Sequence, residues 1–217
     1  MKIQSIALSL PLLLLAGCAG LLGGGKPADL YRLEIASAAP AAAAPPARRT
    51  VLVLPVQFTP QSSGDRILTV RGPQAMYVKG ARWISPVPDL FATNMERSFA
   101  ARAPDILLTS PREPGGAGYA LLVMVQRFAA IYPAGSAKLV TPTVQIEGEA
   151  RLLRASDHRT IAARRFSSEA HATDNRVTAI VEAFDTATDR YLAGLVDWAS
   201  RSASTGAAPI GIEAMDR

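Results

Sequence analysis

The residue with the widest range of chemistry is Cys18, because a thiol can form a disulfide, bind a metal or accept a covalent modification. It is the single cysteine of the 217-residue chain. Three interpretations are open for it: a buried thiol, one half of an intermolecular disulfide, or an acceptor for a modifying group. The residues that precede and follow it decide between them.

The start of the chain has the pattern of an export signal. Lys2 supplies a positive charge, and Ile3 to Ala16 is a largely apolar run. This run has the length of a signal-peptide hydrophobic region and is too short to span a bilayer comfortably, which takes roughly 20 residues. We therefore predict a signal peptide over residues 1–17.

The residues directly before the cysteine resemble the bacterial lipobox, in the order Leu15, Ala16, Gly17 and Cys18. In that motif the chain is cut before the cysteine, which then carries a diacylglycerol on sulfur and an acyl group on its new amine. The resemblance implies lipid attachment at Cys18. It leaves no thiol for a disulfide, and we expect no other cofactor.

The residue after the cysteine implies a destination. Ala19 stands where an aspartate usually retains such lipoproteins in the inner membrane of Gram-negative bacteria. We therefore expect a lipid anchor in the outer membrane, on its periplasmic face. Residues 18–29 are small and glycine-rich, and they form a flexible tether in this interpretation.

Composition argues against nucleic-acid binding. The formal charge is +5, from 23 basic and 18 acidic residues. The arginines are scattered, with no basic run and no interleaved aromatic residues. An exported chain also meets no nucleic acid, so a mildly cationic surface near anionic headgroups is a simpler explanation.

The sequence contains no convincing catalytic or metal-binding pattern. His158 and His171 have no second ligand at helical or strand spacing. Glu147 and Glu149 share one face of a predicted strand, but a solvated face explains them better than acid–base chemistry. Glycine-rich 114–118 lacks the lysine of a phosphate loop, and no nucleophile elbow is present. We predict neither an enzyme nor a metal site.

The elements around these residues predict a single α/β domain over 30–203. Apolar and alternating runs predict strands at 30–35, 51–56, 105–109, 119–128, 144–152 and 160–170, and a hairpin at 67–78. Helices are expected from Ser85, as N-cap, to Pro104, and from Thr173 or Asp174 for about 25 residues. A Pro/Ala-rich linker occupies 38–49, and 204–217 is a predicted disordered tail. The fold class is a layered mixed sheet with antiparallel additions, packed by two main helices.

Aromatic and charged residues cluster between 65 and 83. Arg82 and Trp83 precede the first predicted helix, and Asp65, Arg66 and Tyr77 belong to the adjoining hairpin. Trp, Tyr and Arg dominate protein interfaces, so these five residues are candidates for partner binding. For Trp83 a second interpretation stays open, in which it closes the core with an arginine stacked on its ring.

An ordered set of motifs resembles the ABC-type transport auxiliary lipoprotein family, of the paraquat-inducible protein C-like type. The set comprises the lipobox Cys18, Tyr31 and Leu33, Pro55-Val56, Asp65-Arg66, Tyr77, Arg82-Trp83, the strand 119–123 and a long closing helix. The resemblance implies a fold similar to the anticodon-binding or TolB N-terminal type. It also implies a non-catalytic role beside an ABC permease and ATPase and an MCE-type protein that bridges the periplasm, in lipid transport that preserves the envelope.

Two other functions remain open from the residues alone. One is a lipoprotein that assists assembly of an outer-membrane complex, and the other, less favoured, is a lipid-anchored envelope enzyme. A homo-oligomer is also open. The sequence does not give the lipid that is carried or the direction of its transport.

Overall fold

The computed structural model describes residues 27–36, 49–112, 116–135 and 140–205. The predicted signal peptide, the lipobox residues, Cys18 and Ala19 lie outside these ranges. So do most of the predicted linker and the residues of the predicted tail from 206 onward. What the sequence predicts for them stays a prediction.

Strands and two helices follow one another in the order expected for a mixed α/β domain. Their bounds are β1 (Asp29–Tyr31), β2 (Arg49–Val53), β3 (Gln57–Phe58), β4 (Arg66–Arg71), β5 (Gln74–Trp83), α1 (Val87–Arg102), β6 (Ile106–Thr109), β7 (Tyr119–Tyr132), β8 (Thr143–Arg154), β9 (Thr160–His171) and α2 (Val177–Thr205).

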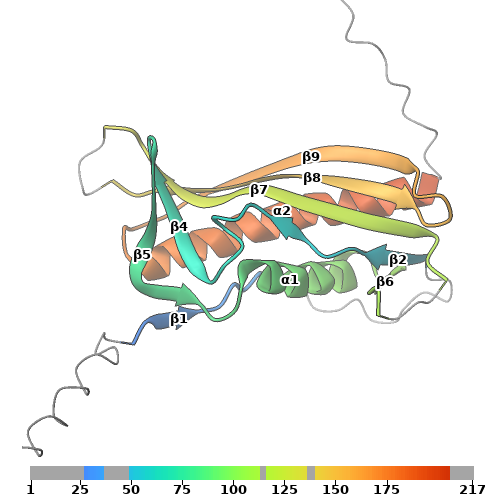
Figure 1. Cartoon of the computed structure of the whole chain (residues 1–217), viewed down its shortest axis with the longest axis horizontal. Helices are drawn as coiled ribbons and strands as arrows, with labels where there is room; N and C mark the ends of the chain where they lie inside the picture. The colour runs from blue at the N-terminus through green and yellow to red at the C-terminus, as the bar shows by residue number, and fades with distance from the viewer. Residues whose placement is uncertain (1–26, 37–48, 113–115, 136–139, 206–217) are drawn as a thin grey trace, which may run out of the picture.

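Strand β7 is the centre of the sheet. The described strands form one nine-stranded sheet with the order β1-β5-β4-β7-β2-β6, and β8 and β9 continue it from β7 (Figure 1). β7 pairs antiparallel with β8 along one edge, whereas its other edge is shared by β2, β3 and β4, all parallel to it. The predicted mixed sheet with antiparallel additions is confirmed.

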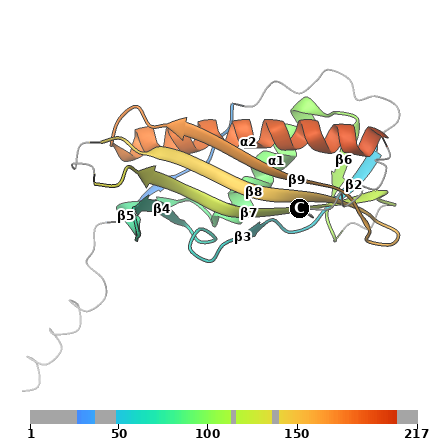
Figure 2. The ribbon, with the colours of Figure 1, turned by 90° about the horizontal axis from the view of Figure 1, so that it is seen from above.

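The alternation that predicted β8 is present in the structure. Val144, Ile146 and Leu152 are fully buried, and the intervening side chains face away from the core. Successive side chains of a strand point to opposite faces, so one face of β8 packs and the other is open. Figure 2 shows both helices on the same side of β7, β8 and β9.

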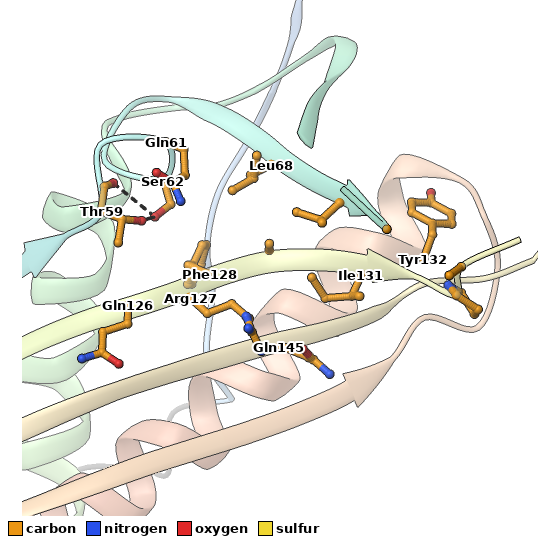
Figure 3. Close-up of a pocket in the computed structure, with 15 residues that line it drawn as sticks. Thr59, Gln61, Ser62, Leu68, Gln126, Arg127, Phe128, Ile131, Tyr132 and Gln145 are labelled. Carbon is orange, nitrogen blue, oxygen red and sulfur yellow. Dashed lines mark hydrogen bonds between the residues drawn. The ribbon is translucent and has the colours of Figure 1, made fainter. Parts of the chain in front are cut away.

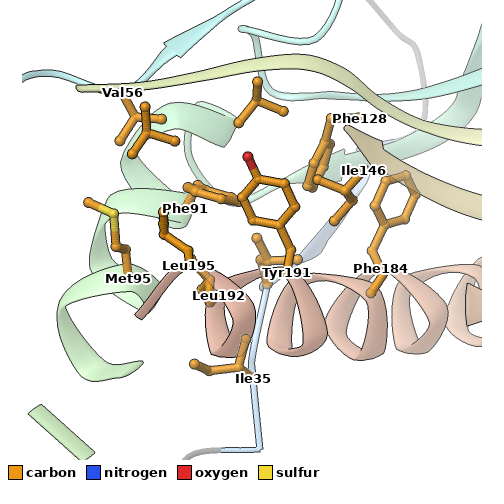
Figure 4. Packing of buried hydrophobic residues seen from close by; sticks show 14 of the residues in the cluster. Ile35, Val56, Phe91, Met95, Phe128, Ile146, Phe184, Tyr191, Leu192 and Leu195 are labelled. Carbon is orange, nitrogen blue, oxygen red and sulfur yellow. The ribbon is translucent and has the colours of Figure 1, made fainter. Parts of the chain in front are cut away.

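The two helices bury the apolar stripes that predicted them. In α1, Phe91, Met95 and Phe99 are at most 1% exposed. In the 29-residue α2, Phe184 and Tyr191 are equally buried, and the Tyr191 ring packs edge-on against Phe91 at a centroid distance of 5.7 Å. Figure 4 shows these rings between the two helices and the sheet.

The start of α1 differs from the prediction. Pro86 occupies the N-cap position, and no side chain caps the helix, so Ser85 is not the cap. The reason lies in a loop before β4: the backbone N–H of Val87 donates to the carbonyl of Gly64 at 3.1 Å. This distant carbonyl satisfies a helix N–H that a serine hydroxyl would otherwise satisfy.

The end of α2 also differs. The helix continues to Thr205, past the predicted start of the tail at 204. Ala203 is 4% exposed, and the Ser204 hydroxyl accepts a hydrogen bond from the Arg49 guanidinium. Burial on one side and a polar contact on the other therefore hold the last turn.

The segment after β1 packs between the helices rather than forming a longer strand. Leu33 and Ile35 are buried, as their alternation predicted. The Asn94 amide of α1 donates to the carbonyl of Leu33 at 2.7 Å, and the backbone N–H of Glu34 donates to the Asp185 carboxylate of α2 at 2.8 Å. Side chains of the helices thus satisfy backbone groups that a neighbouring strand would otherwise pair.

The predicted hairpin is β4 and β5. Arg71 pairs with Gln74, so Gly72 and Pro73 form a two-residue turn. Gly72 has a φ of +52°, which suits the first central position of a hairpin turn and is easily adopted by glycine alone.

Candidate functional site

Trp83, a candidate for partner binding, lies in the core. It is 2% exposed, and its ring meets Phe184 edge-on at a centroid distance of 5.3 Å and Phe128 at 6.3 Å. It stands at the end of β5, where alternation turns it inward and its neighbour Arg82 outward. Of the two interpretations of Trp83, the structure therefore supports the core one, and for Asp65, Arg66, Tyr77 and Arg82 partner binding stays a prediction.

The arginines of the predicted cluster have other partners than Trp83. Arg82 forms an ion pair with Asp65 at 3.0 Å, and both side chains are nearly half exposed. The guanidinium carbon of Arg66 lies 3.9 Å from the centroid of the Tyr77 ring. Within this cluster Arg66 stacks on Tyr77, and Arg82 does not stack on Trp83, because Arg82 and Trp83 face opposite sides of their strand.

These contacts brace the loop 59–65, which joins β3 to β4. The Tyr77 hydroxyl donates to the carbonyl of Gln61 at 3.1 Å, and the backbone N–H of Trp83 donates to the carbonyl of Asp65 at 2.7 Å. Within the loop, the hydroxyls of Thr59 and Ser62 are 2.9 Å apart and hydrogen-bonded. The predicted partner cluster therefore holds this loop in place.

The braced loop forms one wall of a groove on the helix-free face of the sheet. The groove has a volume of about 560 Å³. Figure 3 shows Leu68 on β4 and Phe128 on β7 at facing sides of the opening, with Thr59, Gln61 and Ser62 of the loop above it. Its other lining residues come from β4, β7, the turn after β7 and Gln145 of β8. A volume of this size is typical of ligand pockets.

Sequence reasoning did not find this groove. Its lining belongs to segments that were predicted only as strands or turns. The opening depends on the departure of β4 from β7 and on a register shift of β7 against β8 between Val125 and Arg127. Neither leaves a pattern in a single sequence. The nearest signal was the Asp65–Trp83 cluster, which marks the loop beside it.

A second, acidic depression lies between the segment after β1 and α2. It is lined by Glu34, Glu182, Asp185, Asp189 and Arg190 and has a volume of about 340 Å³. Burial raises the pKa of the Asp185 carboxyl to about 6, and the neighbouring charges of Glu34 and Glu182 act in the same direction. The backbone N–H of Glu34 acts in the opposite direction by hydrogen-bonding the charged form.

The residues weighed for catalysis have structural partners. Glu147 binds Arg127, and Glu149 binds Arg151, across or along the open face of the sheet. The two ring nitrogens of His171 lie 2.8 and 3.1 Å from the hydroxyls of Thr141 and Thr143. Within the described ranges, no group of three or more His, Cys, Asp or Glu is placed to hold a metal ion.

Within the same ranges, no helix is both long enough and apolar enough to cross a membrane.

Comparison with known proteins gives one family match. The model of the ABC-type transport auxiliary lipoprotein component family matches residues 31–195. A search of curated protein sequences found no match.

Solved structures share the fold. Protein XCC0632 from Xanthomonas campestris is 25% identical, with a TM-score of 0.71 over 82% of this chain and 98% of that one. An uncharacterized protein is 16% identical, with a TM-score of 0.62 over 81% of this chain and 100% of that one. The hypothetical protein CT253 from Chlamydia trachomatis is 10% identical, with a TM-score of 0.50 over 73% and 99%.

Proposed function

Because the chain belongs to the ABC-type transport auxiliary lipoprotein family, we propose that it is the outer-membrane auxiliary of an ABC transport system that moves lipid between the two membranes. In this role it contacts an MCE-type protein that bridges the periplasm, while a permease and an ATPase of the inner membrane supply the energy. The match over 31–195 is the observation that carries the proposal.

The anchor in this proposal is Cys18. One acyl chain gives only marginal membrane binding, and each buried CH₂ adds about 0.8 kcal/mol. A cysteine with a diacylglycerol and an N-acyl chain therefore holds the domain at the membrane almost permanently. Ala19 allows export to the outer membrane, and the glycine-rich tether gives the domain reach into the periplasm.

The contact surface in this proposal is the exposed side of the β4–β5 hairpin. Asp65 and Arg82 are partly exposed and paired there, and Arg66 stacks on Tyr77. An exposed ion pair contributes little to folding, roughly 0–1 kcal/mol. These side chains are therefore free to exchange partners on binding without loss of the fold.

Membrane purification tests the proposal. The wild-type chain should take up labelled palmitate, fractionate with the outer membrane, and co-purify with an MCE protein and an ABC permease. Cys18→Ser should lose the label and leave an uncleaved or soluble form, and Ala19→Asp should move the protein to the inner membrane in an enteric host. Recovery of outer-membrane assembly proteins in place of transporter subunits would refute the transport role but would not contradict the predicted lipid anchor at Cys18.

A further inference from the structure

Two exposed apolar side chains lie on adjoining segments at the edge of the sheet. Leu30 of β1 is 61% exposed, and Ile84, directly after β5, is 48% exposed. Leu30 lies opposite Arg82 in the parallel pairing of the two strands, and the backbone N–H of Ile84 donates to the carbonyl of Tyr31 at 2.8 Å. Because Tyr31 and Trp83 pack against the core, their neighbours Leu30 and Ile84 point away from it. We call Leu30 and Ile84 the edge patch.

The arginines beside the edge patch are already paired with carboxylates. Arg82 forms its ion pair with Asp65 at 3.0 Å, and Arg32 lies 3.4 Å from Glu34. All four side chains are substantially exposed, so water hydrates the pairs. The edge patch therefore offers apolar area within a neutral polar border, rather than a positive charge that would attract an anionic surface.

The anchor proposed above holds this end of the domain near the membrane. Eleven residues lead from Cys18 to Asp29, and a flexible chain of that length has a root-mean-square span of roughly 17–20 Å. Along α2, Asp185 contacts the segment after β1 and Ser204 contacts the start of β2, and the 19 residues between them extend about 28 Å. Figure 1 shows β1 and β6 at opposite ends of the molecule. The tether therefore keeps β1 close to the bilayer and leaves β6 distant.

The area of the edge patch separates a membrane from a protein as its occupant. A stable protein interface buries about 800 Å² on each partner, which two side chains do not supply. A bilayer needs no such area here, because the anchor already holds the edge patch at a high effective concentration beside the lipid. Interfacial apolar groups enter the boundary between headgroups and acyl chains by about 5–10 Å, a depth that suits side chains at the edge of a sheet.

We propose that Leu30 and Ile84 insert into the headgroup region of the phospholipid bilayer that carries the anchor. The proposal rests on lipid attachment at Cys18, which alone leaves the domain free to rotate on its tether. Two apolar contacts beside the first strand restrict that rotation and turn one end of the domain towards the membrane. The ion pair of Arg82 with Asp65 then lies at the border between the lipid and the partner surface proposed above.

The test uses the full chain, purified from membranes and reconstituted in vesicles of phosphatidylethanolamine and phosphatidylglycerol. Since the Cys18 sulfur then carries diacylglycerol, Ile84→Cys introduces a single reactive thiol, which is labelled with the fluorophore NBD. We expect blue-shifted emission and quenching by doxyl-labelled lipid. Leu107→Cys is the matched control, because Leu107 is 42% exposed but belongs to the distant β6. Its label should be quenched at least about threefold less, since it lies beyond the interfacial layer.

A second substitution tests whether apolar contact holds the label in the lipid. Leu30→Asp, combined with labelled Ile84→Cys, should reduce quenching to the level of the Leu107→Cys control, because a carboxylate resists transfer out of water. Met76→Asp makes a comparable change at a side chain that is also 48% exposed, on β5 but outside the edge patch, and should leave quenching unchanged. Vesicles of phosphatidylcholine alone should quench the Ile84→Cys label equally, because the neighbouring arginines are paired.

Three results would overturn the proposal. The first is equal quenching of the Ile84→Cys and Leu107→Cys labels, and the second is quenching that disappears without phosphatidylglycerol. The third is a blue shift that doxyl lipid does not quench and that appears only at high chain density, which would show that a second copy covers the edge patch. Intact mass separates the proposal from its premise: an acylated chain with an unquenched Ile84→Cys label refutes the edge patch alone, whereas a chain without acyl groups refutes the anchor as well.

Discussion

Successive side chains of strands β7, β8 and β9 point to opposite faces of the sheet, and the two faces serve different purposes. On the helix side, Val144, Ile146 and Leu152 of β8 are fully buried. On the open side, Gln145 and Glu147 bind Arg127 and belong to a polar ladder, and the groove lies next to them. The helix side therefore carries the stability of the domain, whereas changes on the open side should affect contacts more than folding.

Trp83→Ala tests whether the helix side carries the stability of the domain, and it has the largest expected effect. The indole ring packs against Phe128 and Phe184 from the edge of the predicted partner cluster. Truncation of a buried tryptophan costs about 3–5 kcal/mol, so the melting temperature should fall by roughly 6–20 °C, at about 2–4 °C per kcal/mol for a domain of this size. Thermal unfolding by circular dichroism measures it. A melting temperature within a degree of wild type would place Trp83 outside the core.

Gly148→Ala should have the next largest effect. A Cβ at this position would lie 2.4 Å from the carbonyl oxygen of Met124 and 2.6 Å from the Tyr191 hydroxyl. The backbone of β7 cannot retreat easily, so we expect a loss of about 1–3 kcal/mol, as for other overpacked cores. Chemical denaturation measures the loss.

Tyr191→Phe provides the control for Gly148→Ala. The Tyr191 hydroxyl is buried without a hydrogen-bond partner among the described residues, and burial raises its pKa. Tyr191→Phe alone should be neutral or stabilising, because it removes an unsatisfied polar group. In the double variant the cost of Gly148→Ala should shrink but not vanish, since the contact with Met124 remains. Strictly additive effects would contradict this packing.

The helix side was largely predictable from the sequence, and the reason is periodicity. Phe91, Met95 and Phe99 repeat at helical spacing, and residues 144–152 alternate at strand spacing, so each pattern identifies both the element and its buried face. The resemblance to the auxiliary lipoprotein family also predicted a role beside an ABC transporter, and the family match supports this class of function. Local patterns suffice here because burial imposes them.

The features that the sequence did not predict lie on both sides of the sheet, and they arise from contacts between distant segments. Ser85 had the composition of an N-cap, but the carbonyl of Gly64 takes the N–H of Val87 instead. Trp83 was recognised as notable, but composition could not decide between core and interface. The groove requires the shift in β7 and the path of the loop 59–65, and neither has a sequence period.

Asp185→Asn should change the pH dependence of stability more than stability itself. Burial raises the pKa of Asp185 to about 6 from an ordinary 3.8. Between these values the folded state binds the proton more tightly than the unfolded state, so the free energy of unfolding decreases as the pH rises. The full difference in pKa corresponds to about 3 kcal/mol, and solvent at this partly exposed carboxyl reduces it to about 1 kcal/mol.

The Asp185→Asn variant lacks this titration. It should match wild type near pH 4 and exceed it by about 1 kcal/mol at pH 7. Its side-chain oxygen can still accept the backbone N–H of Glu34. Urea unfolding of both proteins across this range gives the comparison. A difference between the two proteins that does not vary with pH would contradict it.

Tyr77→Phe should have the smallest effect on folding and so gives the finest test of the open side. Its hydroxyl is exposed and donates to the carbonyl of Gln61, which otherwise can bond to water. We expect a loss of at most about 1 kcal/mol, since a typical hydrogen bond contributes 0.5–1.5 kcal/mol net. The stacking of Arg66 should survive, because the ring remains. The expected consequence is local: amides of the loop 59–65 should exchange faster while those of β8 stay unchanged.

Thr186→Val, which removes a hydroxyl bound within α2, is the matched control and should leave the loop unaffected. If Tyr77→Phe instead accelerated exchange in the β8 core, the two faces would be coupled, and the separation of stability from contact would be wrong.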